Sequence, residues 1–212
     1  MPLQNRVDPF GAIHAVDARG MFTGNRGVIH DPETRTLLRR RWTTKAWLVC
    51  ACKFRGRRRV VMGRNAPGGG VGWTELFFLD EVTALAAGHR PCFYCRRAWA
   101  EVFVACFGKA FSIPRPRVHE IDVRLHAERL ASGGTPVDLK PDEWRNLPDG
   151  AVIAEGDRAY AVRHGSLLPW SFEGYGAPFL PGALSGRLVT PPTMVAVLSA
   201  GYEPVWHPSA TS

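Results

Sequence analysis

The segment TALAAGHRPCFYCRRAWAEVF, residues 83–103, constrains the fold more than any other stretch of the chain. Its alanine-rich first part is typical of a helix, and Gly88 marks the position just past the end of that helix. Pro91 then bends the chain, Cys92 and Cys95 follow, and a second helical pattern begins. The sequence therefore predicts two helices joined by a tight corner that carries a Cys-x-x-Cys pair.

Such a pair is typical of half of a tetrahedral zinc site, because one turn can direct both thiolates toward the same ion. For the remaining ligands we consider His30, Cys50 and Cys52. Cys50 and Cys52 alternate along a predicted strand, so we expect that only one of them faces the metal. Two alternatives stay open at this point: a redox dithiol, and a pair of reduced structural thiols.

A second segment shows that this corner can also be purely architectural. Residues 197–207, VLSAGYEPVWH, repeat the pattern of residues 84–94, ALAAGHRPCFY, with a helix end, a glycine and a proline. The second copy has no cysteine. Only the cysteines and the arginines that follow them therefore require a functional explanation.

Positive charge is concentrated in the first half of the chain. The net charge is +8. Residues 1–109 hold 18 Lys or Arg against 8 Asp or Glu, whereas residues 110–212 hold 9 against 11. Between Arg35 and Arg64 there are eleven basic residues and no acid. Arginine suits bidentate phosphate contacts, so we expect a polyanionic partner, with nucleic acid ahead of a membrane. The expected phosphate contacts are Arg39, Arg40, Arg41, Arg57, Arg58, Arg59, Arg96 and Arg97.

The remaining patterns predict an α+β fold with small antiparallel sheets and three to four helices. Helices are expected near residues 80–87, 97–107 and 117–130, with Gly108 ending the second. A last helix is expected after Thr190 as its cap. Residues 131–150 have linker composition, which suggests a basic domain over residues 1–131 and a small mixed subdomain over residues 132–212.

The helix predicted at 117–130 carries a candidate catalytic group. Asp122 and His126 are four residues apart and share a face, and Glu128 follows. A histidine base oriented by a carboxylate would suit this spacing. A helix surface with ordinary ion pairs would show the same pattern.

The segment FFLDEVTALAAGHRPCFYCRR, together with FTGNRGVIHD at residues 22–31, resembles the metal-binding domain of the Ada family of DNA-repair proteins. The likeness covers about residues 20–97. It implies an Ada-like fold in the N-terminal half, DNA as the partner, Cys92 and Cys95 as the second pair of zinc ligands, and His30 in the first pair. Where the family has another early cysteine, this chain has residues 31–34, DPET, so Cys50 would have to supply that thiolate.

The sequence thus predicts a nucleic-acid-binding protein, with DNA expected ahead of RNA as the partner, a structural zinc site, and a role in DNA repair or DNA modification. The alternative is a metal- or histidine-dependent enzyme acting on nucleic acid, as a nuclease or in base or abasic-site processing, with His126, Asp122 and Glu128 as catalytic residues. We expect no membrane partner and a cytoplasmic location, because no apolar run has membrane-spanning length and the first residues lack a signal-peptide pattern.

Overall fold

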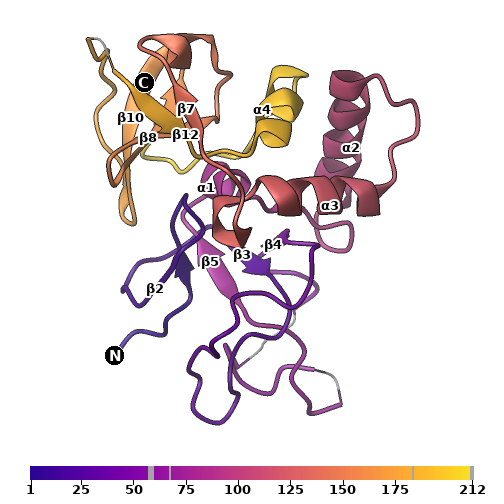
Figure 1. Cartoon of the computed structure of the whole chain (residues 1–212). Helices are drawn as coiled ribbons and strands as arrows, with labels where there is room; N and C mark the ends of the chain where they lie inside the picture. Colours follow the sequence, from indigo (N-terminus) through magenta and orange to yellow (C-terminus); the bar gives the residue numbers. More distant parts are fainter. Residues whose placement is uncertain (57–59, 67, 183, 211–212) are drawn as a thin grey trace.

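The computed structural model describes residues 1–56, 60–66, 68–182 and 184–210. Within these ranges the chain forms four α-helices and two six-stranded sheets, which confirms the predicted α+β class. The second sheet lies at one end of the molecule and the loop-rich first sheet at the other, with α1 (Glu81–Ala86) between them (Figure 1). None of the helices in the described ranges is long and apolar enough to cross a bilayer.

The first sheet is mixed and has the order β2-β1-β5-β3-β4-β6. Two of its pairings are parallel, β1 with β5 and β4 with β6, and the other pairings are antiparallel. Its strands are β1 (Arg6–Val7), β2 (Ile13–His14), β3 (Phe22–Asn25), β4 (Leu48–Ala51), β5 (Leu76–Phe78) and β6 (Arg90–Pro91).

The second sheet is antiparallel throughout, in the order β11-β10-β9-β8-β12-β7. Its β9–β10 hairpin turns at His164 and Gly165, whose φ values of 47° and 71° suit the two-residue turns that follow the natural twist of strands. Its strands are β7 (Val137–Leu139), β8 (Val152–Glu155), β9 (Arg158–Arg163), β10 (Ser166–Ser171), β11 (Gly174–Tyr175) and β12 (Gly186–Leu188).

The helix signals around residue 88 are confirmed. Asp80 caps α1, and its carboxylate accepts a hydrogen bond from the Thr83 amide at 2.8 Å. Gly88 has a φ of 75°, as expected just after a helix end. The next helix, α2 (Arg97–Phe111), continues through Gly108, so the predicted stop there is wrong. Gly108 serves close packing instead, because a Cβ at this position would lie 2.7 Å from the Ile113 carbonyl oxygen.

The last helix begins differently from the prediction. α4 (Pro192–Ser199) has no side-chain cap from Thr190, whose hydroxyl instead accepts a hydrogen bond from the Val152 amide at 2.8 Å. Glu128, at the end of α3 (Val118–Glu128), takes over the capping role. Its carboxylate accepts hydrogen bonds from the Thr193 amide and hydroxyl at 2.8 and 2.6 Å. Capping by a residue 65 positions away leaves no local sequence signal.

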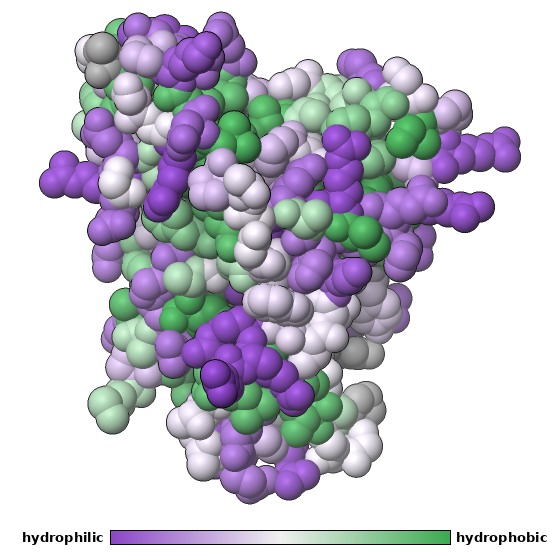
Figure 2. Space-filling view, in the orientation of Figure 1, coloured by the Kyte–Doolittle hydropathy of each residue, from purple (hydrophilic) through white to green (hydrophobic). Residues whose placement is uncertain are grey.

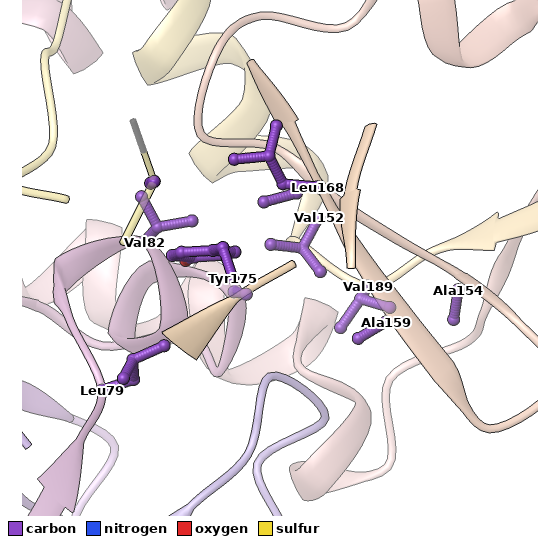
Figure 3. Packing of buried hydrophobic residues seen from close by; sticks show 11 residues of the cluster. Leu79, Val82, Val152, Ala154, Ala159, Leu168, Tyr175 and Val189 are labelled. Atoms are coloured by element: carbon purple, nitrogen blue, oxygen red, sulfur yellow. The ribbon is translucent and has the colours of Figure 1, made fainter. Parts of the chain in front are cut away.

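Two hydrophobic clusters join the halves of the chain. In the first, Val82 of α1 packs against the second sheet, and Figure 3 shows Tyr175 between Val82 and the sheet residues Val152 and Leu168. The second cluster joins α2, α3 and α4 with Leu85. Both clusters contain residues from either side of residue 131. The division into two domains stays a prediction, and the two segments it separates are packed together.

The C-terminal segment returns to the start of α1. The Tyr202 hydroxyl and the Val205 amide donate hydrogen bonds to Glu81 at 2.7 and 3.0 Å, and the His207 amide donates to Asp80 at 3.0 Å. The cysteine-free repeat at residues 197–207 is therefore a structural corner that anchors the chain end.

Candidate metal centre and its basic rim

Three cysteines converge at one edge of the first sheet. Cys50 lies on β4, and Cys92 and Cys95 lie in the turn between β6 and α2. Their sulfur atoms are all within 4.8 Å of one another. In a tetrahedral zinc site with Zn–S bonds of about 2.3 Å, sulfurs stand roughly 3.8 Å apart. Small side-chain adjustments would therefore allow all three sulfurs to bind one ion.

Strand pairing explains why Cys50 joins the pair. β4 and β6 run parallel, with Val49 opposite Pro91. The residues that follow them, Cys50 and Cys92, are therefore neighbours as well. The Cys92 amide donates a hydrogen bond to the Val49 carbonyl at 3.0 Å, which fixes the register. The Arg96 amide then donates to the Cys92 carbonyl at 2.9 Å and closes the turn that brings Cys95 back toward Cys92.

The surroundings of the sulfurs favour a thiolate at Cys92, whereas the pKa values of Cys50 and Cys95 are raised. The Tyr94 amide donates to Cys92 Sγ and the Ala51 amide to Cys95 Sγ, both at 3.4 Å. Hydrogen bonds from Cys50 and then Cys95 lower the pKa of Cys92, whereas the hydrogen bond to Cys92 raises the pKa of Cys50 well above its usual range. A cation bound here would replace the protons that the thiols share. This soft donor set fits zinc, and also copper(I) or an iron–sulfur cluster.

Cys52 and His30 lie outside this group of three. As expected, only one of Cys50 and Cys52 joins the group, although Cys52, which follows the end of β4, lines the same cavity. Cys52 Sγ instead donates to the Met21 carbonyl at 3.3 Å. His30 is buried elsewhere, with Nδ1 2.6 Å from the Thr74 hydroxyl. The ligand set that the structure assembles is therefore Cys50, Cys92 and Cys95, without His30.

The three sulfurs face a cavity of about 300 Å³. Aromatic side chains form much of its wall, and one carboxylate and one amide also line it. The lining includes Phe54, Trp73, Phe77, Tyr94, Glu75 and Asn25. Since no fourth ligand joins the group in the described ranges, a metal held by the three thiolates would have a coordination position open toward this cavity.

Part of the predicted basic segment forms the rim of the cavity. Lys53 and Arg55, both exposed, follow directly after the Cys-bearing strand. The Arg55 guanidinium lies 5.2 Å from the ring centroid of Phe54 and 5.7 Å from that of Tyr94, and both rings line the cavity. Arg57, Arg58 and Arg59 lie outside the described residues. The described part of this segment thus places positive charge beside the cysteines.

The other predicted phosphate contacts differ in exposure. Arg39, Arg40 and Arg41 are exposed. Arg97 is exposed as well, and lies 3.5 Å from Glu101. Figure 2 shows a compact group of strongly hydrophilic side chains over the half of the molecule that contains the first sheet and its loops.

Arg96 departs from the prediction, because its side chain is only 4% exposed. Its guanidinium donates two hydrogen bonds to the buried carboxylate of Glu81, at 2.6 and 2.8 Å. It therefore holds α1 against the start of α2, and its guanidinium is buried away from the surface where a phosphate backbone would bind.

The predicted catalytic group on α3 is divided among separate contacts. Both Asp122 oxygens accept hydrogen bonds from Arg90, at 2.7 and 2.8 Å, and the pair is buried. Glu128 caps α4, as described above. The His126 ring packs edge-on against Trp42, and burial lowers the pKa of His126. These contacts match the alternative interpretation of a helix surface with structural ion pairs.

Comparisons of the chain with protein-family models, curated proteins and solved structures give no match. The resemblance to the Ada family therefore rests on the motif residues alone. The fold and the site define an α+β protein whose three clustered cysteines could hold a metal ion.

Proposed function

We propose that this protein binds nucleic acid, DNA in preference to RNA, beside a zinc ion held by Cys50, Cys92 and Cys95. The observation that carries the proposal is the position of the basic segment at the rim of the cysteine-lined cavity. Lys53 and Arg55 would contact phosphates. A role in DNA repair or DNA modification accords with the Ada-like motif at residues 84–97.

The cavity wall supports contact with an unpaired base. Phe54 and Tyr94 offer aromatic faces beside the Arg55 guanidinium, and such a combination stacks on bases without requiring a particular sequence. A volume of about 300 Å³ is at the small end of ligand pockets, which suits one extruded nucleobase.

Zinc would have a structural role in this scheme. By joining β4 to the turn before α2, it would fix the rim residues relative to the sheet. Methyl transfer to a zinc-bound cysteine is not part of the proposal, because residues 31–34 lack the early cysteine of the Ada family.

Metal analysis tests the zinc site. We expect about one equivalent of zinc in the purified protein and none in the Cys92→Ser, Cys95→Ser double variant. Cys106→Ser is the matched control, because Cys106 is a buried cysteine of the α2 core outside the group of three. Absence of metal from the parent protein would refute the site.

The salt dependence of DNA binding tests the rim. If about five phosphates are contacted, the logarithm of affinity should fall with the logarithm of salt concentration at a slope near −4 to −5. Lys53→Ala with Arg55→Ala should reduce that slope by about 2, whereas Arg158→Ala, an exposed arginine on β9, should leave it unchanged. A slope near zero in the parent protein would refute nucleic-acid binding through this rim.

The open coordination position favours a second candidate, a metal-dependent enzyme acting on nucleic acid. A bound zinc ion would supply Lewis acidity at the cavity wall. Glu75 lines the same cavity, is 4% exposed, and accepts a hydrogen bond from the Met62 amide at 2.9 Å. Its other oxygen accepts a hydrogen bond from the Asn65 side-chain amide at 2.5 Å, so the carboxylate is held in the cavity wall. In this candidate function Glu75, and not the α3 residues, would accept a proton in the cavity.

Turnover of damaged or abasic DNA separates the two candidates. If the protein is an enzyme, Glu75→Gln should abolish turnover and retain zinc and DNA binding, and His126→Ala should leave turnover unchanged. If no zinc-dependent turnover is found, the enzyme candidate is refuted and the binding function is the one that remains.

A further inference from the structure

A second cavity, of about 600 Å³, lies among the N-terminal segment, the turn after α3 and strand β12. It shares no lining residue with the cysteine cavity. Three arginines line it, Arg26, Arg41 and Arg187, and its described lining contains no acidic residue. A concentration of guanidinium groups without carboxylates is the composition expected of an anion site.

Arg26 is the best-defined part of this cavity, since its side chain is completely buried. Its Nε donates to His89 Nε2 at 3.1 Å, its Nη1 donates to the Gly11 carbonyl at 2.9 Å, and its guanidinium lies 4.0 Å from the Trp47 ring centroid. Nη2 is buried and has no hydrogen-bond partner among the described residues.

The charge of Arg26 is not matched by a bonded carboxylate. The acid that acts on it electrostatically is Asp8, whose oxygens are engaged by the Ala12 amide at 2.9 Å and by His14 at 2.7 Å. Arg129, also buried, stacks on Trp47 at 4.4 Å and adds a second positive charge. Burial, and then the charge of Arg129, lower the pKa of Arg26 to about 9. An isolated buried charge is costly, so this region would be stabilised by a bound anion.

Arg187 brings a second unsatisfied donor to the same cavity. Its Nε is buried and makes no hydrogen bond within the described part of the chain, and its guanidinium lies 5.6 Å from the Phe10 ring centroid. Arg41, at the exposed side, donates to backbone carbonyls, including that of Arg39 at 3.2 Å. Phe10, Ile13 and Leu130 give the cavity an apolar wall.

We infer that this cavity binds the phosphate group of a small phosphorylated molecule, with Arg26 and Arg187 as its main donors. Phosphate matches three guanidiniums better than a carboxylate does, because it carries more charge and more acceptor oxygens. The apolar wall offers contact area for an organic body attached to the phosphate. The inference does not rest on the proposed function, because the cysteines and the rim residues Lys53 and Arg55 take no part; of the arginines predicted from sequence to contact nucleic acid, Arg41 lines this cavity.

Binding of inorganic phosphate and of adenosine 5′-monophosphate to the full-length protein tests the inference, by isothermal titration calorimetry and by the shift of the unfolding temperature. We expect saturable binding at one site. Arg187→Gln should weaken it tenfold or more, because each charge-assisted hydrogen bond contributes substantially to affinity. Arg187→Lys should restore part of the loss. Arg117→Gln, an exposed arginine at the start of α3, is the matched control and should bind like the parent.

A second variant keeps the test valid if Arg187→Gln fails to fold. Arg41 is exposed, so Arg41→Gln should fold normally and should also weaken binding. Tighter binding of the nucleotide than of inorganic phosphate would assign the site to an organic phosphate, and equal binding would assign it to free phosphate. No saturable binding of either ligand at millimolar concentration would overturn the inference. So would equal losses in Arg117→Gln, or binding that survives both Arg187→Gln and Arg41→Gln.

Discussion

Replacement of Arg96 by alanine separates a structural role for this residue from a role in phosphate binding. In the folded protein Glu81 is completely buried and accepts hydrogen bonds from Arg96, Tyr202 and the Val205 amide. Removal of Arg96 would leave a buried carboxylate without its cation. Breaking a buried ion pair in this way costs about 3–5 kcal/mol.

That cost should be visible in equilibrium unfolding. For a chain of this size, we expect the melting temperature of Arg96→Ala to fall by roughly 6–20 °C, because about 1 kcal/mol corresponds to about 2–4 °C. Arg97→Ala is the matched control: the neighbouring arginine is 70% exposed and its ion pair with Glu101 is solvent-screened, so it should change stability by less than about 0.5 kcal/mol.

Urea unfolding followed by circular dichroism measures both variants. If Arg96→Ala were as stable as Arg97→Ala, the buried network between α1 and α2 would be wrong. A loss of DNA affinity in Arg96→Ala without a loss of stability would mean that Arg96 contacts phosphates, as the sequence predicts.

Further predictions concern the same part of the fold. Burial, with the charges of Arg26 and Arg129, lowers the pKa of His89 well below its usual value, so below about pH 6.5 only the unfolded chain takes up this proton. Stability measured by urea unfolding should therefore fall as the pH decreases below about 6.5, by up to about 1.4 kcal/mol per pH unit, and His89→Gln should reduce that slope. Glu128→Ala should destabilise the protein by about 1–2 kcal/mol through loss of the α4 cap, as thermal unfolding would show. Gly88→Ala should also lower the melting temperature, because its φ is 75° and a Cβ would lie 2.4 Å from Arg129 Cγ; a stable variant would contradict this packing.

The local part of the fold could be predicted from sequence because its signals lie within a few residues. Asp80 as a cap, Gly88 after the helix and the Cys-x-x-Cys turn depend on backbone geometry of the immediate neighbours. The predicted helix end at Gly108 was wrong because the sequence alone does not distinguish a glycine that is needed for close packing inside a helix from a glycine that ends one.

The candidate site was less predictable, because strand pairing and long-range ion pairs assemble it. Cys50 and Cys92 are brought together by the parallel pairing of β4 with β6, which no local pattern encodes. Arg96 and Arg97 are adjacent in a basic sequence, and only the position of Glu81 distinguishes the buried arginine from the exposed one. Glu75 gave no signal in the sequence, since a single carboxylate beside a strand is common.

X-ray absorption at the zinc edge of the purified protein tests the central claim most directly. We predict three sulfur neighbours at about 2.3 Å and one lighter neighbour at about 2.0–2.2 Å, with one sulfur lost in Cys50→Ser. Four sulfur neighbours would mean that Cys52 completes the site, and a spectrum without sulfur neighbours would contradict the proposed metal centre.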